Sequence, residues 1–137
     1  MAKSLQIQIN SSYKRKKKLL EDTAVNAVKE KLEEIARYAT NVSPVDTGAY
    51  VTSFSYTIGA GRPRGKSSLN KPTGVDTESA KAEGLSNLMR DISQIRELQD
   101  IKRIELRNGA PHAEYVENGN GNSRGHFVFT KIRGEFR

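Results

Sequence analysis

The 137-residue sequence contains no cysteine and no tryptophan, and it has only two histidines. Without cysteine there is no disulfide, no thiolate metal ligand and no cysteine nucleophile. No run of about 18 apolar residues is present, so we expect no membrane-spanning helix and no membrane partner. The N-terminus lacks the apolar core of a signal peptide, so secretion is not expected.

Residues suited to catalysis or to metal binding are equally scarce. His112 lies close in sequence to Glu114 and Glu117, but no second histidine or cysteine accompanies them. A good metal site needs three or four convergent ligands. The serines lie in turns without the pattern of a nucleophile elbow. We therefore expect no metal, no cofactor and no enzymatic activity.

The composition is that of one ordinary domain with a modest core. Hydrophobic residues make up 35% of the chain and charged residues 28%. A chain of this length and composition is predicted to form a single domain over residues 1–137, with part of its stability supplied by partners.

The positive charge is concentrated in three segments. Residues 1–18 carry a net charge of +6, residues 60–75 carry +4 and residues 124–137 carry +3. Because the whole chain has a net charge of +7, the remainder is acidic at −6. Such segments favour contact with an anionic partner, and DNA, RNA, a membrane surface or an acidic protein would all qualify on charge alone. The candidate contact residues are Lys14, Arg15, Lys16, Lys17, Lys18, Arg62, Arg64 and Lys66.

The first third of the chain predicts a short strand and a long helix. Leu5, Ile7 and Ile9 alternate with polar residues, which is typical of a strand. Over about residues 15–41, apolar residues recur at spacings of three and four, which predicts one apolar stripe on a helix. The basic run then stands at the helix start, where positive charge is unfavourable with the macrodipole. This placement favours a functional anionic contact over a merely solvated helix start.

A corner follows the helix. Pro44 disfavours helix in the preceding residue, so the helix should end near residues 41–43. Asp46 and Thr47 suit a tight turn, and Gly48 can adopt a positive φ. The next residues, 49–59, alternate as a half-buried strand, with one face formed by Tyr50, Phe54, Tyr56 and Ile58.

Residues 60–100 read as an inserted basic loop and a second helix. Residues 60–75 are rich in Gly, Pro, Lys and Ser, which predicts a flexible loop. The stretch 61–65 is similar to Arg-Pro hooks that enter the minor groove, but a plain basic loop is the favoured interpretation. Helical spacing of apolar residues predicts a helix over about residues 77–99.

The last part predicts a strand at residues 103–107, which ends at an Asn-Gly turn. Pro111 then opens a single helical turn, and glycine-rich sequence follows. The fold class is therefore α+β: a short N-terminal strand, a long helix, and an antiparallel sheet packed on that helix, with the insertion around residues 60–100.

Two stretches together resemble the tail-completion family of long-tailed bacteriophages, also described as neck or head–tail joining proteins. The first is Ser43-Pro44-Val45-Asp46-Thr47-Gly48-Ala49-Tyr50. The second is His112-Ala113-Glu114-Tyr115-Val116-Glu117-Asn118-Gly119. Their order and spacing agree with the family, and the resemblance covers residues 4–59 and 101–129. The C-terminal helix that family members often carry is expected to be short or absent here.

The resemblance implies a non-enzymatic virion protein of a long-tailed phage, made in the host cytoplasm and located at the neck. It implies a structural corner formed by Pro44, Asp46, Thr47 and Gly48, and a second family motif formed by Ala113, Tyr115, Val116, Glu117 and Gly119. Copies would form a ring that completes the tail top and joins it to the head connector. The implied partners are further copies, the connector or adaptor, the tail terminator or tail tube, and the DNA passing through the ring.

The charge pattern supports an alternative, a small basic nucleic-acid-binding module. The joining protein and the module differ in salt behaviour, because neutralising phosphates makes DNA affinity fall steeply as salt rises. For a ring, the helix at residues 15–41 and the sheet containing Tyr50–Ile58 are the candidate contact faces.

Overall fold

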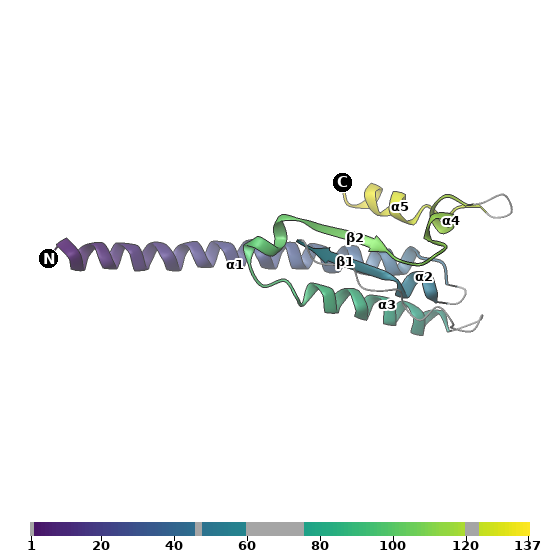
Figure 1. Cartoon of the computed structure of the whole chain (residues 1–137), viewed down its shortest axis with the longest axis horizontal. Coiled ribbons are helices and arrows are strands. Elements are labelled where there is room, and N and C mark those ends of the chain that lie inside the picture. The colour runs from purple at the N-terminus through teal and green to yellow at the C-terminus, as the bar shows by residue number, and fades with distance from the viewer. Residues whose placement is uncertain (1, 46–47, 60–75, 120–123) are drawn as a thin grey trace.

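The computed structural model describes residues 2–45, 48–59, 76–119 and 124–137, with side chains described from residue 11 onward. Its α+β architecture agrees with the predicted fold class and is shown in Figure 1. In chain order the elements are α1 (Ala2–Val42), α2 (Ala49–Thr52), β1 (Phe54–Ile58), α3 (Thr77–Ile92), the 3-10 helix η1 (Leu98–Lys102), β2 (Ile104–Asn108), α4 (Ala113–Asn118) and α5 (Val128–Glu135).

Helix α1 packs on the body through its C-terminal half. Val25, Leu32, Ala36 and Ala39 are buried and follow helical spacing along one face. The helix ends at Val42, before Pro44, as the sequence predicts. In its N-terminal half α1 extends beyond the rest of the molecule, and we refer to residues 2–20 as the arm (Figure 1).

The predicted N-terminal strand is wrong, because residues 4–9 lie within α1. A strand needs a neighbour to pair with its backbone, and among the described residues the only sheet is β1 with β2. A helix satisfies its backbone hydrogen bonds within itself, so a segment that projects away from the sheet favours it.

The corner is only partly the one predicted. Gly48 has a positive φ of 83°, as expected, whereas Asp46 and Thr47 lie outside the described residues. Residues 49–52, predicted as strand, form the helical turn α2 instead. The turn is closed locally, because both the backbone nitrogen and the hydroxyl of Thr52 donate to the carbonyl of Gly48, at 3.1 and 2.6 Å.

The sheet consists of β1 and β2, paired antiparallel with Phe54 opposite Asn108 and Ile58 opposite Ile104. The prediction of a half-buried strand is wrong, because every residue of β1 from Phe54 to Thr57 is buried. The phenol of Tyr56 donates to the carbonyl of Leu32 in α1 at 2.8 Å, and its backbone nitrogen donates to Asp91 in α3 at 3.0 Å. The strand is therefore held between the two long helices.

Helix α3 begins at Thr77, as predicted, and Asp76 caps it by accepting a hydrogen bond from the backbone of Ser79 at 3.0 Å. It ends at Ile92 rather than near residue 99. The helix does not continue because the Asp100 carboxylate accepts hydrogen bonds from the backbone nitrogens of Arg96 and Glu97. These hydrogen bonds start the separate turn η1. The same two hydrogen bonds lower the pKa of Asp100.

Candidate assembly surfaces

The fold brings the two sequence motifs together. Tyr50, at the end of the first motif, contacts the ring of His112 from the second, with centroids 6.4 Å apart. The Asn108 side chain donates to the Tyr50 carbonyl at 2.8 Å and joins the end of β2 to α2. Tyr50 also packs edge-on against Phe54, at 5.3 Å. The motifs therefore share one structural unit, although more than 50 residues separate them in the chain.

Tyr50 is buried, and its hydroxyl has no hydrogen-bond partner among the described residues. Burial, and to a lesser extent the charge of Glu117, raise the pKa of this phenol above its ordinary value. An unpaired buried hydroxyl is unfavourable, since it has lost water without gaining a partner. The rest of the unit must therefore supply the stability that holds Tyr50 in place.

Glu117 of the second motif anchors the C-terminal helix. Its carboxylate accepts hydrogen bonds from the backbone nitrogens of Phe129 and Thr130, at 2.8 and 3.1 Å, and from the Thr130 hydroxyl at 3.0 Å. These are the first-turn nitrogens of α5, which have no partner within the helix. Glu117 thus acts as a cap supplied from a distant part of the chain, and sequence spacing alone does not reveal this role.

The other residues of the second motif divide into packed and exposed positions. Ala113 and Val116 are half-buried against the core. Gly119 has a φ of 79° and pairs in an isolated bridge with Arg124. Tyr115 remains 59% exposed on α4. Tyr115 therefore offers a large aromatic side chain to a partner.

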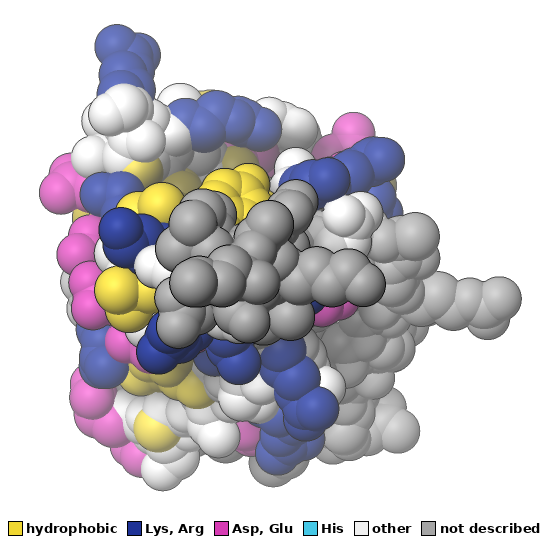
Figure 2. Space-filling model, turned by 90° about the vertical axis from the view of Figure 1, so that its left-hand side faces the viewer, with side chains coloured by type: hydrophobic (Ala, Val, Ile, Leu, Met, Phe, Trp, Pro, Cys, Tyr) yellow, Lys and Arg dark blue, Asp and Glu magenta, His cyan; other side chains and the backbone are white. Residues whose placement is uncertain are grey.

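The arm carries the basic run Lys14–Lys18, and all five of its side chains are exposed. Figure 2, which faces this end of the molecule, shows dark-blue lysine and arginine side chains around the helix end with apolar side chains between them. The run does not stand at a helix start as predicted, because α1 begins at Ala2. The helix macrodipole acts only within the first turn, so it does not disfavour the basic run, and the argument for a functional contact from the macrodipole fails. The exposure of the run remains compatible with such a contact.

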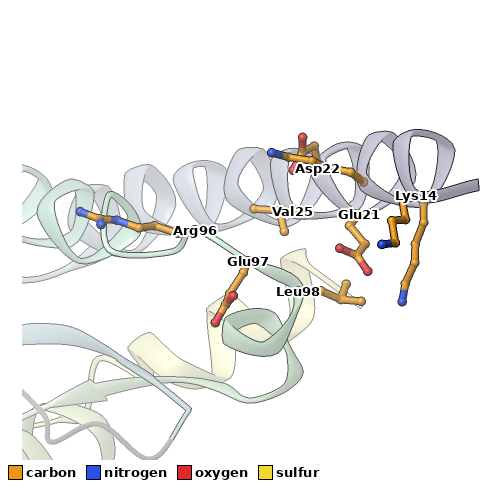
Figure 3. Close-up of a pocket in the computed structure, with 9 residues that line it drawn as sticks. Lys14, Glu21, Asp22, Val25, Arg96, Glu97 and Leu98 are labelled. Atoms are coloured by element: carbon orange, nitrogen blue, oxygen red, sulfur yellow. The ribbon is translucent and has the colours of Figure 1, made fainter. Parts of the chain in front are cut away.

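A groove of about 460 Å³ lies where the arm meets the body. Lys14, Lys17 and Lys18 line one side, and residues 96–98 line the other. In Figure 3, Lys14 and Glu21 extend from α1 toward Leu98. Lys18 precedes the buried Val25 by seven residues, and Lys14 precedes Lys18 by four, so the core face of α1 continues onto the arm as a charged face that also carries Glu21.

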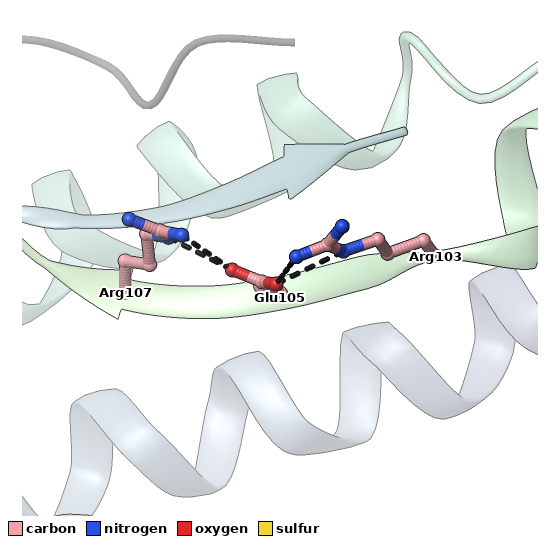
Figure 4. A network of polar contacts seen from close by, with 3 residues as sticks. All are labelled: Arg103, Glu105 and Arg107. Carbon is pink, nitrogen blue, oxygen red and sulfur yellow. Dashed lines mark hydrogen bonds and ion pairs between the residues drawn. The ribbon is translucent and has the colours of Figure 1, made fainter. Parts of the chain in front are cut away.

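A second cationic surface lies on β2, and the sequence analysis did not single it out. Glu105 lies between Arg103 and Arg107 and accepts hydrogen bonds from both guanidinium groups, at 2.8 and 2.6 Å (Figure 4). These hydrogen bonds, from Arg103 and then Arg107, lower the pKa of Glu105. The alternating Arg-Glu-Arg pattern of a strand was the available signal, since it places all three side chains on one face.

Some predicted contacts lie outside the described residues, namely Arg62, Arg64 and Lys66, with the rest of the loop at 60–75. Within the described part of the chain, no cluster of histidine and acidic residues could hold a metal ion. In the same part, no helix is both long enough and apolar enough to cross a membrane.

Comparison with known families identifies a match that covers most of the chain. The family described as "Bacteriophage HK97-gp10, putative tail-component" matches residues 7–119, a range that contains both motifs. No curated protein and no solved structure matches the chain. The match covers most of the sequence and agrees with the resemblance carried by the two motifs. The chain belongs to the HK97-gp10-like family and is a structural component of a bacteriophage tail.

Proposed function

We propose that copies of this chain form a ring at the neck of a long-tailed phage. The ring completes the top of the tail, joins it to the head connector, and lets the genome pass through its centre. Residues 1–137 act in it as one tail-completion domain. The observation that carries this proposal is the convergence of both motifs in one unit, in a chain of a tail-component family.

The shape of the subunit supports assembly. Along α1, no side chain between residues 11 and 20 is buried. A helix without tertiary packing is marginal in water, and repulsion between Lys14 and Lys18, four residues apart, weakens it further. A partner that covers the arm would stabilise it, as expected for a protein completed by its neighbours.

The exposed cations indicate that the partner surfaces carry negative charge. Lys14–Lys18 in each copy, with Arg103 and Arg107, can face DNA in the channel or acidic surfaces of the connector, the terminator or the tail tube. Replacing all five residues of the run with glutamine should leave folding intact, because these side chains are exposed, and should reduce particle assembly. Unchanged infectivity of such a phage would show that the run is not a working contact.

The test of the joining role is electron microscopy of lysates from a phage in which this gene is interrupted. The proposal predicts full heads and finished tails lying unattached, or tails with defective tops. Normal, infectious particles would overturn it.

The alternative is a small nucleic-acid-binding module, favoured by the exposed basic run. A binder that makes about six phosphate contacts should lose roughly 10³-fold in DNA affinity between about 50 and 200 mM salt. Absent or salt-insensitive DNA binding by the isolated chain would exclude the module and leave the joining role unaffected.

A further inference from the structure

Large exposed apolar side chains fall into two groups at opposite ends of the molecule. Among the side chains that the structure describes, the first group is on or beside the arm: Tyr13, Leu19, Leu20 and Leu98. The second group, Tyr115 and Phe127, lies where α4 meets α5, at the end of the body away from the arm (Figure 1). Two separate apolar patches on a small subunit are typical of interaction sites.

The arm presents its apolar side away from the groove. Tyr13 and Leu20 are seven residues apart and therefore share one side of α1; they are 66% and 71% exposed. Lys14 and Lys18 lie on the side that continues the core face toward Val25. Tyr13 and Leu20 thus lie on a different side of α1 from Lys14 and Lys18, with Lys17 at the boundary lining the groove, and none of the described elements covers them.

The second patch is built around a strained residue. Phe127 has a φ of 52°, in the left-handed region that a bulky side chain rarely adopts. Its backbone nitrogen is held by the Glu117 carbonyl at 3.0 Å, next to the bond from His126 to Val116 at 2.7 Å. These bonds place Phe127 beside the C-terminal part of α4, which carries Tyr115. Asparagine or glycine would suit this backbone better, so the phenylalanine is a residue whose presence the backbone itself does not favour.

We infer that the Tyr13–Leu20 side of one copy packs on the Tyr115–Phe127 patch of the next copy. This inference rests on the proposed ring and names its two contact faces. A closed ring needs two unlike faces on each subunit, and these patches are unlike and lie at opposite ends. Glu114, exposed beside Tyr115, gives the second patch an acidic residue to face Lys16 and Lys17, which lie three and four residues after Tyr13 on the same side of α1.

The arm is long enough for such a contact. A helix rises about 1.5 Å per residue, so the arm is roughly 28 Å long. The sheet face suggested by the sequence is unsuitable, because residues 50–57 are buried within the subunit. The arm of one copy therefore packs on the patch of the next copy, and the contact does not require strands to be exchanged between copies.

The absence of cysteine from the chain permits a direct cross-linking test in assembled particles. A phage carrying both Leu20→Cys and Tyr115→Cys should, on mild oxidation, give a ladder of covalently linked copies. Each single variant, and Leu20→Cys combined with Ser86→Cys on the exposed side of α3, should give no ladder. Linkage by Leu20→Cys alone would indicate a symmetric contact and overturn the inference.

Microscopy of the same particles separates this inference from the proposed ring. If the chain forms a ring at the neck and the paired cysteines stay unlinked, the two faces are wrong and the ring stands. If the chain is absent from the neck, the proposed function itself fails.

A second variant separates folding from contact. Phe127→Asn relieves the left-handed strain, so the isolated chain should melt no lower than the wild type, while particle yield should fall at least tenfold. Leu20→Glu should lower the yield similarly, and Asn26→Glu, an equal charge on an exposed polar position of α1, should not. Full yields with both Phe127→Asn and Leu20→Glu would also overturn the inference.

Discussion

Gly84 lies in α3 at its closest approach to α2, and this approach gives a sharp test of the packing. A Cβ added at Gly84 would lie less than 3.0 Å from the carbonyl oxygen of Val51 and 3.1 Å from the carbonyl carbon. The two nearest atoms belong to the backbone, and the third is Cγ2 of Val51 at 3.2 Å, so rotation of a side chain alone cannot make room. Gly84→Ala must therefore separate the two helices or bend one of them.

The expected magnitude follows from two opposing effects. Alanine is favoured over glycine in a helix interior by about 1 kcal/mol. Overpacking a filled site costs about 1–3 kcal/mol, and a clash with backbone belongs in the upper part of that range. Gly84→Ala should thus lower the free energy of unfolding by about 1–2 kcal/mol despite its better helix propensity.

The assay is urea unfolding of the isolated chain, with Gly134→Ala as the matched control. Gly134 lies near the end of α5, and a Cβ there meets nothing within 4 Å. The control should be neutral or stabilising by up to about 1 kcal/mol. With an m-value of about 2 kcal/mol/M, Gly84→Ala should lower the midpoint by roughly 0.5–1 M. Equal or higher stability of Gly84→Ala than of Gly134→Ala would refute the close approach.

Four further outcomes follow from the structure. Gly48→Val should lower the free energy of unfolding by more than about 1 kcal/mol, because φ is 83° there; an unchanged melting temperature would refute the turn. Tyr50→Phe removes a buried hydroxyl that has no hydrogen-bond partner in the described part of the chain, and it should be neutral or stabilising. Tyr56→Phe loses the hydrogen bond to the Leu32 carbonyl and should cost about 1 kcal/mol in thermal unfolding; the reverse order would contradict this. Glu117→Ala should cost about 1–3 kcal/mol and Glu117→Gln less, since glutamine keeps one acceptor for the first turn of α5; equal losses in urea unfolding would count against the cap. Burial raises the pKa of both Tyr50 and Tyr56 in the folded state. Their contribution to the free energy of unfolding is therefore complete below the unfolded pKa of about 10 and is lost as pH rises above that value. Urea midpoints that stay constant up to about pH 11 would contradict this.

The sequence predicts the elements that depend on local signals. Pro44 marks the end of α1, the spacing of its apolar residues marks the buried face, and Gly48 adopts the positive φ expected at the corner. The alternation at residues 103–107 corresponds to β2, and the second helix starts at Thr77. In each case the residue type itself restricts the backbone or sets the period, so no tertiary information is needed.

The errors occur where tertiary context decides. Alternation at residues 4–9 is compatible with a strand, but among the described residues no strand neighbours this segment. Tyr50 fits a strand face by period, yet Thr52 closes a helical turn on Gly48. Gly84 weakens a helix by its low helix propensity, but its lack of a side chain permits the close contact with Val51.

The candidate surfaces were predictable in part. The sequence indicates the basic run and the two motifs, and the exposure of Lys14–Lys18 fits that interpretation. It does not indicate that Glu117 caps α5, that Phe127 is left-handed, or that Tyr13 and Leu20 lack cover. These features depend on how distant segments meet, which periodicity and composition do not encode.

The most direct test of the account is a cryo-electron microscopy reconstruction of the neck of the intact phage. The account predicts a closed ring of copies between the head connector and the tail tube, with the arm of each copy lying on the α4–α5 end of the next. A neck fully explained by other proteins, with this chain elsewhere in the tail or missing from the particle, would contradict it.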